Sequence, residues 1–273
     1  MDPYPVKTEF RHLNNTRVVE KIVGIGGTGI VIQQGRYAVK IPRISRVIER
    51  DGIPVTKGRL TPEEGNYDER PPLIREIEAE KEIYRRLGDH PGILRCYNLS
   101  SSHPSIQMEL MKNGDLRHYL DQTRPARNQQ LSWLIQMANT LAYIHHQRVV
   151  VSDIRSDNLL LDDNLDLKFA DFGNSTLMPL DWDLCGGDDL GYSILTDIGQ
   201  FGAVMFEIVV GHKCEFDVLH DWNKPGDPTS WPPRDSLPST TGMWLGHIVE
   251  KCWTQGYKDA NDLVSELEEE VLR

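Results

Sequence analysis

The sequence has few of the features that mark an extracellular or membrane protein. Its four cysteines are widely scattered and form no C-x-x-C pair, which argues against a zinc site or disulfide framework and favours a reduced compartment. The most apolar stretch, 201–210, contains Glu207 and is too short to span a bilayer. Residues 1–11 are polar and interrupted by proline, unlike a secretion signal.

Basic charge is also scarce. The 273 residues carry a formal net charge of -11, with 30 Lys and Arg against 41 Asp and Glu. A protein that binds nucleic acid or an anionic membrane needs a basic surface, so we expect neither partner. We expect a monomer that is cytoplasmic or nuclear and is not secreted.

The pattern of apolar residues changes along the chain. Residues 18–41 alternate β-branched residues with glycines, which predicts a strand, a turn and a strand. Further strands are expected over 93–99 and 106–110, and the helical period predicts helices over 73–87 and 130–146. A β-rich part followed by a helical part predicts an α+β fold with two lobes.

A long polar segment, residues 43–72, separates the first strands from the first helix. It is rich in charge and is bounded or interrupted by Pro42, Pro54, Pro62, Pro71 and Pro72. This composition predicts a long loop. Such a loop inside a domain is unusual, and is either functional or disordered.

The first motif is a glycine-rich run followed by a strand. It consists of Gly24, Ile25, Gly26, Gly27, Thr28, Gly29, Ile30 and Val31. Glycine lets the backbone approach phosphates closely and reach positive φ. Because a second strand follows in place of a helix, a glycine-rich hairpin is favoured over a dinucleotide-binding turn. An ordinary glycine-rich turn remains the alternative.

The second motif is a lysine that needs a partner. Alternation places Ala38 and Lys40 on one face of their strand, and a buried lysine requires an opposite charge or a ligand. Glu80 lies in the apolar stripe of the 73–87 helix and is the expected partner, with Glu76 as the second choice. Lys81 lies off this stripe and is expected in solvent. An edge-strand Lys40 in water is the alternative.

The strongest signal is Asp153-Ile154-Arg155-Ser156-Asp157-Asn158 followed by Asp171-Phe172-Gly173. With G-x-G-x-x-G-x-V, A-V-K and a helix glutamate before it, the chain resembles the eukaryotic protein-kinase family from about residue 18 to its end. The combined order and spacing are specific, although each motif alone is weak. The amino-acid sequence of residues 151–173 particularly resembles that of fungal protein-kinase-domain proteins, with Val151-Ser152-Asp153 in place of H-R-D.

The resemblance implies a bilobal kinase-like fold that uses ATP and Mg²⁺. The small N-lobe would cover residues 1–111, with the long polar loop 43–72 inside it, and the larger C-lobe residues 112–273. The nucleotide's phosphates would lie under the glycine-rich loop, at Gly24, Ile25, Gly26, Gly27, Thr28 and Gly29. Phosphoryl transfer depends on positioning and charge stabilisation, which these elements would supply.

The resemblance also assigns the chemistry. Asp153 would accept the proton of the substrate hydroxyl, and Lys40, placed by Glu80, would hold the α- and β-phosphates. Arg155 would carry positive charge near the transferring phosphate; the alternative is a surface arginine paired with Asp157. The implied Mg²⁺ ligands, both oxygen donors, are Asn158 and Asp171.

The adenine and ribose site implied by the resemblance has seven residues. They are Val31, Ala38, Met108, Glu109, Met111, Asp115 and Leu160. Met108 would guard the back pocket, the backbone of Glu109 and Met111 would bind adenine, and Asp115 would bind ribose. For the apolar members, ordinary core packing is the alternative.

The chain departs from the family in two places. Ser152 cannot pair with a phosphorylated activation loop as the usual arginine does, and only residues 174–195 separate the D-F-G motif from Asp197. No A-P-E motif ends this segment. Asp197–Gly202 resembles the start of the buried helix that supports the catalytic loop. We therefore expect no activation by loop phosphorylation, and the surface that docks a peptide is in doubt.

Three functions stay open on this sequence. The first is an ATP- and Mg-dependent serine/threonine protein kinase with a shortened activation segment, acting on an unknown protein substrate. The second is a pseudokinase or nucleotide-binding scaffold, suggested by Val151, Ser152 and the missing A-P-E. The third is a kinase of small molecules.

Overall fold

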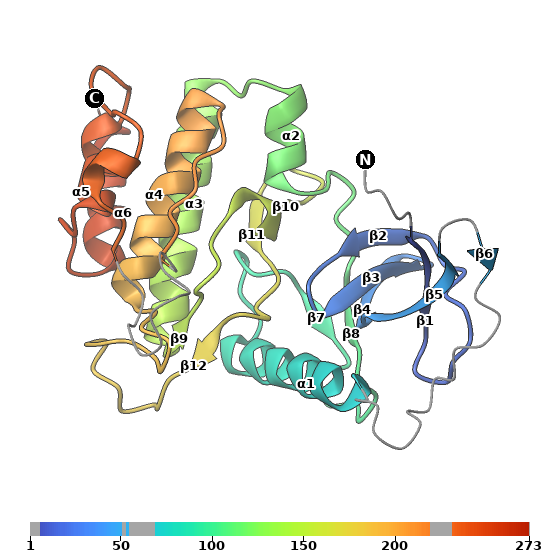
Figure 1. Ribbon diagram of the computed structural model, residues 1–273. Helices are drawn as coiled ribbons and strands as arrows, with labels where there is room; N and C mark the ends of the chain where they lie inside the picture. The colour runs from blue at the N-terminus through green and yellow to red at the C-terminus, as the bar shows by residue number, and fades with distance from the viewer. Residues whose placement is uncertain (1–5, 51–52, 55–68, 219–230, 273) are drawn as a thin grey trace. The chain divides into compact units, whose positions relative to one another are not determined.

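The structure is a computed structural model that describes residues 6–50, 53–54, 69–218 and 231–272. The chain divides into two compact units. The first unit comprises residues 1–85 and 95–110, and the second comprises residues 86–94 and 111–273. Strands dominate the first unit and helices the second, which confirms the predicted α+β class (Figure 1).

A five-stranded antiparallel sheet forms the centre of the first unit, in the order β2-β3-β4-β8-β7. Its strands are β2 (Ile22–Ile25), β3 (Gly29–Gln34), β4 (Tyr37–Pro42), β8 (Ile106–Glu109) and β7 (Cys96–Tyr97). The strand predicted over 93–99 is shorter than expected. Its first residues belong to the second unit, where Leu94 N donates to Phe169 O at 2.9 Å.

A second, three-stranded sheet has the order β1-β5-β6, with β1 at Val6–Arg11, β5 at Ile44–Arg50 and β6 at Ile53–Pro54. The prediction of a loop throughout 43–72 is therefore wrong at its start; residues 51–52 and 55–68 lie outside the described part of the chain. The strand forms because β5 pairs antiparallel with β1, a partner distant in sequence. Phe10 of β1 packs against the buried cluster of Ile30, Ile32, Val39 and Ile41.

Helix α1 (Arg70–Leu87) confirms the helix predicted over 73–87 and begins three residues earlier. Pro71 and Pro72 lie in its first turn, where backbone N–H groups have no partner within the helix. The expected stripe is buried at Ile77, Glu80 and Tyr84. The expectation for Lys81 is wrong, because this side chain is fully buried.

The second unit is built on two long helices, α3 (Arg127–His146) and α4 (Ile194–Val210). Shorter helices accompany them: α2 (Leu116–Gln122), α5 (Gly246–Trp253) and α6 (Ala260–Glu269). Its core contains the buried side chains of Trp133, Leu134, Phe201 and Trp253. The N-cap of α4 is a reciprocal capping box, in which Ser193 and Thr196 each bond the other's backbone N–H.

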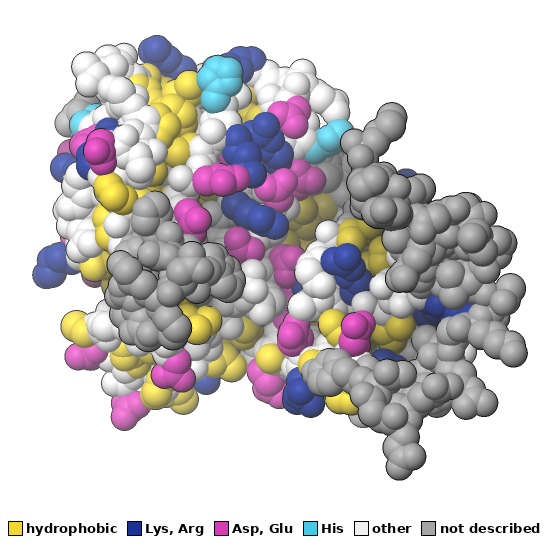
Figure 2. All heavy atoms as spheres, in the orientation of Figure 1, with side chains coloured by type: hydrophobic (Ala, Val, Ile, Leu, Met, Phe, Trp, Pro, Cys, Tyr) yellow, Lys and Arg dark blue, Asp and Glu magenta, His cyan; other side chains and the backbone are white. Residues whose placement is uncertain are grey.

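Two small antiparallel strand pairs carry the loops of interest in the second unit. Strand β10 (Leu159–Leu161) pairs with β11 (Leu167–Phe169), and β9 (Val149–Val150) pairs with β12 (Thr176–Leu177). Within the described residues, no helix is both long and apolar enough to cross a membrane. Acidic and basic side chains are interspersed over the face that Figure 2 shows.

Candidate active site

The glycine-rich loop joins β2 to β3 and is held by one hydrogen bond across the loop and one from the Arg43 side chain. Gly26 N donates to Gly29 O at 2.8 Å, and Arg43 Nη1 donates to Gly26 O at 2.9 Å. None of the glycines in this loop has a positive φ, so left-handed backbone is not what favours glycine here. At Gly29 the lack of space favours glycine, because a Cβ there would lie 2.9 Å from Lys40 Cε.

The lysine and glutamate expected to pair do meet within the first unit. Lys40 Nζ lies 2.7 Å from Glu80 Oε2, and the two side chains are 6% and 2% exposed. Glu76, the second choice, is exposed. Burial, followed by the charge of Glu80, raises the pKa of the nearby Cys96 thiol, so this cysteine stays protonated beside the pair.

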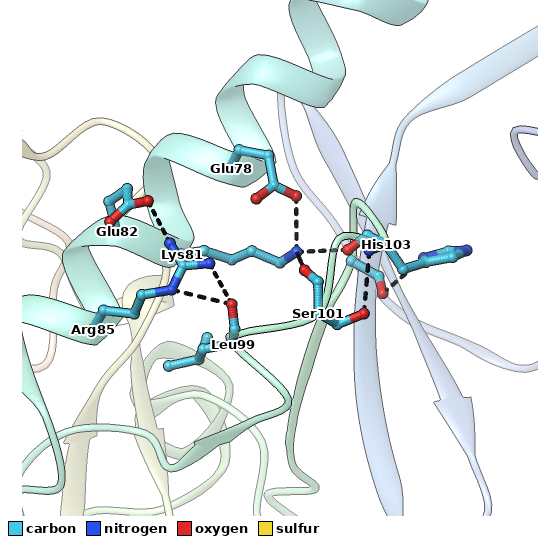
Figure 3. A network of polar contacts seen from close by, with 8 residues as sticks. Glu78, Lys81, Glu82, Arg85, Leu99, Ser101 and His103 are labelled. Atoms are coloured by element: carbon cyan, nitrogen blue, oxygen red, sulfur yellow. Dashed lines mark hydrogen bonds and ion pairs between the residues drawn. The ribbon is translucent and has the colours of Figure 1, made fainter.

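Helix α1 is fixed to the segment before β8 by a buried lysine (Figure 3). Lys81 Nζ donates to Ser101 O at 3.0 Å and His103 O at 2.5 Å, and pairs with Glu78 Oε1 at 2.8 Å. One turn later, Arg85 Nε donates to Leu99 O at 3.1 Å. A charged group with three oxygen partners can be buried, so this network fixes the rotation of the helix that carries Glu80.

The residues expected around adenine lie partly in the first unit. Ala38 is paired in register with Met108, and Val31 with Lys40, so the strand pairing groups these positions. Met108 is 5% exposed. Glu109 N donates to Arg95 O at 3.0 Å, so this backbone N–H is already engaged.

The remaining expected nucleotide residues lie in the second unit. Asp115 and Leu160 form an antiparallel bridge, and Met111 O accepts from Gly114 N at 3.3 Å. Asp115 is also the N-cap of α2, because its Oδ1 accepts from His118 N at 2.7 Å. One carboxylate oxygen of Asp115 is thus engaged in capping.

Side chains of α4 hold the loop that carries Asp153 through hydrogen bonds. The fully buried Asp197 accepts from Val151 N through Oδ2 and from Ser152 N through Oδ1, both at 2.8 Å. Gln200 accepts from Ile154 N at 2.9 Å and donates to Ser152 O at 2.8 Å. These bonds hold Ser152 at a φ of 66°, an uncommon conformation for a residue with a side chain.

The carboxylate of Asp153 is surrounded by polar groups. Asn158 Nδ2 donates to both Asp153 O and Asp153 Oδ2 at 3.0 Å, and Asn174 Nδ2 donates to Oδ2 at 3.1 Å. Arg155 Nε lies 3.7 Å from Asp153 Oδ1, so the structure places this arginine by Asp153 and not by Asp157. Burial, with the charge of Asp153 next, raises the pKa of Tyr192 and keeps its hydroxyl neutral.

The two expected Mg²⁺ ligands are brought together by the β10–β11 pair. Ala170 N donates to Asn158 O at 2.9 Å, which puts Asp171 beside Asn158. Because Asn158 Nδ2 points to Asp153, its Oδ1 is the end left for a cation. The described residues contain no cluster of three His, Cys, Asp or Glu ligands. Two oxygen ligands fit Mg²⁺, which keeps waters and phosphate oxygens around it.

Hydrogen bonds within the chain hold the short segment after Gly173. Asp188 is its centre: Oδ2 accepts from Thr176 Oγ1 at 2.7 Å, and Oδ1 accepts from Leu190 N and Tyr192 N at 2.9 Å. At its start, Ser175 Oγ donates to Val151 O at 2.9 Å. A neutral hydroxyl and backbone groups thus satisfy this carboxylate.

Several residues of the site were not found from the sequence. Gln200 stands one turn after Asp197, and that helical spacing could have revealed it. His145, whose Nε2 lies 2.9 Å from Asp197 Oδ2, and Ser156, which donates to Glu207 at 2.8 Å, had no such signal. Asn174 also had no signal in the sequence, because its hydrogen bond to Asp153 joins two separate loops.

Residues 18–185 match the protein kinase domain family, so the chain belongs to that family. The matched stretch carries the glycine-rich loop, the Lys40–Glu80 pair and the Asp153 loop, and it ends inside the short segment after Gly173. The fold is therefore that of a protein kinase domain.

Among known proteins, the chain is similar to "Serine/threonine/tyrosine-protein kinase HT1" of Arabidopsis thaliana, with 26% identity over 72% of this chain and 55% of that protein. "Probable serine/threonine-protein kinase PBL28" of the same plant is 32% identical over 51% of this chain and 44% of its own length. "Probable serine/threonine-protein kinase kinX" of Dictyostelium discoideum is 30% identical over 68% of this chain and 17% of its own length. The chain thus spans about half, or less, of these relatives.

Proposed function

We propose that the chain is an ATP- and Mg²⁺-dependent protein kinase that transfers the γ-phosphoryl group to serine or threonine hydroxyls. The observation that carries the proposal is the arrangement of Asp153, Asn158 and Asp171 on two adjoining loops of the second unit. Membership of the protein kinase domain family supports phosphotransfer, and the names of the similar plant and Dictyostelium proteins support serine or threonine as acceptor.

Each part of the site has a role in this proposal. Lys40, held by Glu80, neutralises phosphate charge, and the glycine-rich loop covers the phosphates. Asn158 Oδ1 and the Asp171 carboxylate hold Mg²⁺, which supplies charge neutralisation of the phosphates when bound. Asp153 receives the proton of the attacking hydroxyl, and Arg155 adds positive charge beside it. Residues 1–111 then form the N-lobe and 112–273 the C-lobe.

The proposal includes activity without phosphorylation of the activation segment. Ser152 carries no charge, and Asp188 already engages Thr176, Leu190 and Tyr192. A phosphate on Thr176 would stand against the Asp188 carboxylate, and like charges repel. The segment therefore has no cationic receiver for a phosphate at these residues.

Incubation with labelled ATP, Mg²⁺ and generic protein substrates tests the proposal. We expect transfer by the native chain and a loss of about 100-fold or more in Asp153→Asn, because removing a general base typically costs that much. Asp163→Asn, which removes an exposed carboxylate of the second unit, is the matched control and should keep full activity. Equal labelling by the native chain and Asp153→Asn would count against the proposal.

A nucleotide-binding scaffold is the second candidate. Val151 and Ser152 in place of the usual histidine and arginine favour it, as does the absence of A-P-E from the sequence. A rise in melting temperature with Mg·ATP and no turnover would support the scaffold. Labelling of a metabolite extract without labelling of protein would support a small-molecule kinase instead.

A further inference from the structure

The residue directly after Asp171-Phe172-Gly173 contacts the carboxylate proposed as the general base. Asn174 Nδ2 donates to Asp153 Oδ2 at 3.1 Å. This hydrogen bond joins the short activation segment to the catalytic loop at the atom that would do the chemistry. Neither the kinase motifs nor the proposed roles above assign any function to Asn174.

The bond completes a specific arrangement around Asp153. Asn158 Nδ2 donates to the same oxygen at 3.0 Å, and Arg155 Nε stands 3.7 Å from the other oxygen. The terminal torsion of an aspartate is broad, so one hydrogen bond leaves the carboxylate plane free to turn. Two amide donors from separate loops fix Oδ2, and Oδ1 is then the oxygen presented to a substrate hydroxyl.

The backbone around Asn174 is well anchored although its side chain is exposed. Phe172 before it is fully buried, and Ser175 N donates to Phe172 O at 3.1 Å. Ser175 Oγ also donates to Val151 O at 2.9 Å, and Thr176 pairs with Val150 in the β9–β12 ladder. Asn174 therefore needs neither a phosphate nor a long peptide platform to reach Asp153.

We propose that Asn174 is a positioning residue that orients the Asp153 carboxylate for phosphoryl transfer. The inference rests on the proposed kinase function and deepens it. Because Asn174 follows the D-F-G turn immediately, any shift of Asp171 and its turn also removes one support of Asp153. Metal binding and general-base geometry are thereby coupled over a few residues.

The neutrality of Asn174 is part of the argument. An aspartate at this position has almost the same shape but offers an oxygen in place of the N–H donor, and it adds a like charge beside Asp153. Coulomb repulsion at this separation disfavours two carboxylates. Asn174→Asp should therefore impair transfer more than Asn174→Ala, although both remove one hydrogen bond.

Steady-state kinetics on the full chain test the inference. Asn174→Ala should lower kcat about tenfold, which matches the loss of one hydrogen bond to a charged group. Asn174→Asp should lower kcat further, and Asn174→Gln, which keeps an amide donor, should retain more activity than Asn174→Ala. The KM for ATP and the thermal shift with Mg·ATP should stay unchanged in all three variants.

Asn139→Ala is the matched control, because it removes an exposed amide of α3 whose one side-chain hydrogen bond among the described residues is to Ile135 O of its own helix. Native kcat in Asn174→Ala would overturn the inference while leaving the kinase function intact. So would a variant whose kcat, KM and melting temperature all change together, since that pattern marks general disruption. A native chain without any turnover would instead overturn the kinase proposal, and the role of Asn174 with it.

Discussion

Two buried carboxylates, one in each unit, are satisfied in opposite ways. Glu80 in the first unit is 2% exposed and lies 2.7 Å from the Lys40 ammonium. Asp197 in the second unit is fully buried and accepts from backbone N–H groups of Val151 and Ser152 and from the His145 ring. The first carboxylate faces an ammonium group, and the second faces two backbone N–H groups and a histidine ring nitrogen.

The difference follows from what each carboxylate has to hold. An ion pair fixes the position of one flexible side chain, here the Lys40 ammonium. Hydrogen bonds to consecutive N–H groups fix a backbone, here the loop that carries Asp153. The ion pair joins Glu80 to one ammonium group at 2.7 Å, whereas the Asp197 cluster spreads the same charge over several donors. Loss of one partner should therefore matter more at Glu80.

The largest effect is expected from Lys40→Met. It removes the cation from a buried carboxylate, and breaking such a pair typically costs about 3 kcal/mol or more of unfolding free energy. Replacing both partners in Lys40→Met/Glu80→Leu should recover most of that loss. Urea denaturation of the two variants measures both values. A single variant as stable as the native chain would show that the ion pair carries no stability.

The second largest effect is expected from Lys81→Met, which tests whether a buried cation contributes to the unfolding free energy as the buried carboxylates do. It leaves the carbonyls of Ser101 and His103 without their ammonium donor, at a cost of about 2 kcal/mol. The contacts of Lys81 fix the rotation of α1, the helix that carries Glu80. The variant should therefore also raise the KM for ATP. Arg75→Met, an exposed change on the same helix, should alter neither quantity.

His145→Ala should lower the unfolding free energy by a smaller amount, about 1 kcal/mol, as measured by urea denaturation. Asp197 would keep its bonds to Val151 N and Ser152 N, so the catalytic loop should stay in place and the KM for ATP should not change. A loss as large as that of Lys40→Met would contradict the contrast between the two carboxylates.

The smallest effect concerns Glu250, a partly exposed carboxylate in the second unit. The hydrogen bond from Arg234 lowers the pKa of Glu250, and Arg234 donates to it twice, at 2.7 and 2.6 Å. A lowered folded-state pKa gives stability that is present above the ordinary value near 4.5 and is lost as the pH falls through the lowered value. The melting-temperature gap between the native chain and Glu250→Gln should thus narrow in acid.

The sequence predicted those parts of the site that depend on local period and motif spacing. Alternation along β4 and the helical stripe of α1 were enough to predict that Lys40 and Glu80 meet. The grouping of Asp153, Asn158 and Asp171 was implied by the resemblance of their motifs to the protein-kinase family. The Lys40–Glu80 inference needed only the regular geometry of a strand and a helix.

The parts that the sequence did not predict depend on partners distant in the chain. The segment that forms β5 reads as a polar loop, since its strand exists only through pairing with β1. Lys81 lies off the apolar stripe of its helix, and the distant carbonyls of Ser101 and His103, with Glu78, make its burial favourable. Asn174 belongs to the same class, because its partner lies 21 residues earlier.

The pairing of β1 with β5 also sets an order of events during synthesis. Phe10 leaves the ribosome before β5, so β1 can complete its pairing with β5 only when Arg50 has emerged. The central sheet is completed later, because β8 supplies the partner of β4 on its other edge. Until residue 109 has been made, the strand bearing Lys40 lacks one neighbour, so the five-stranded sheet is completed late in the translation of the first unit.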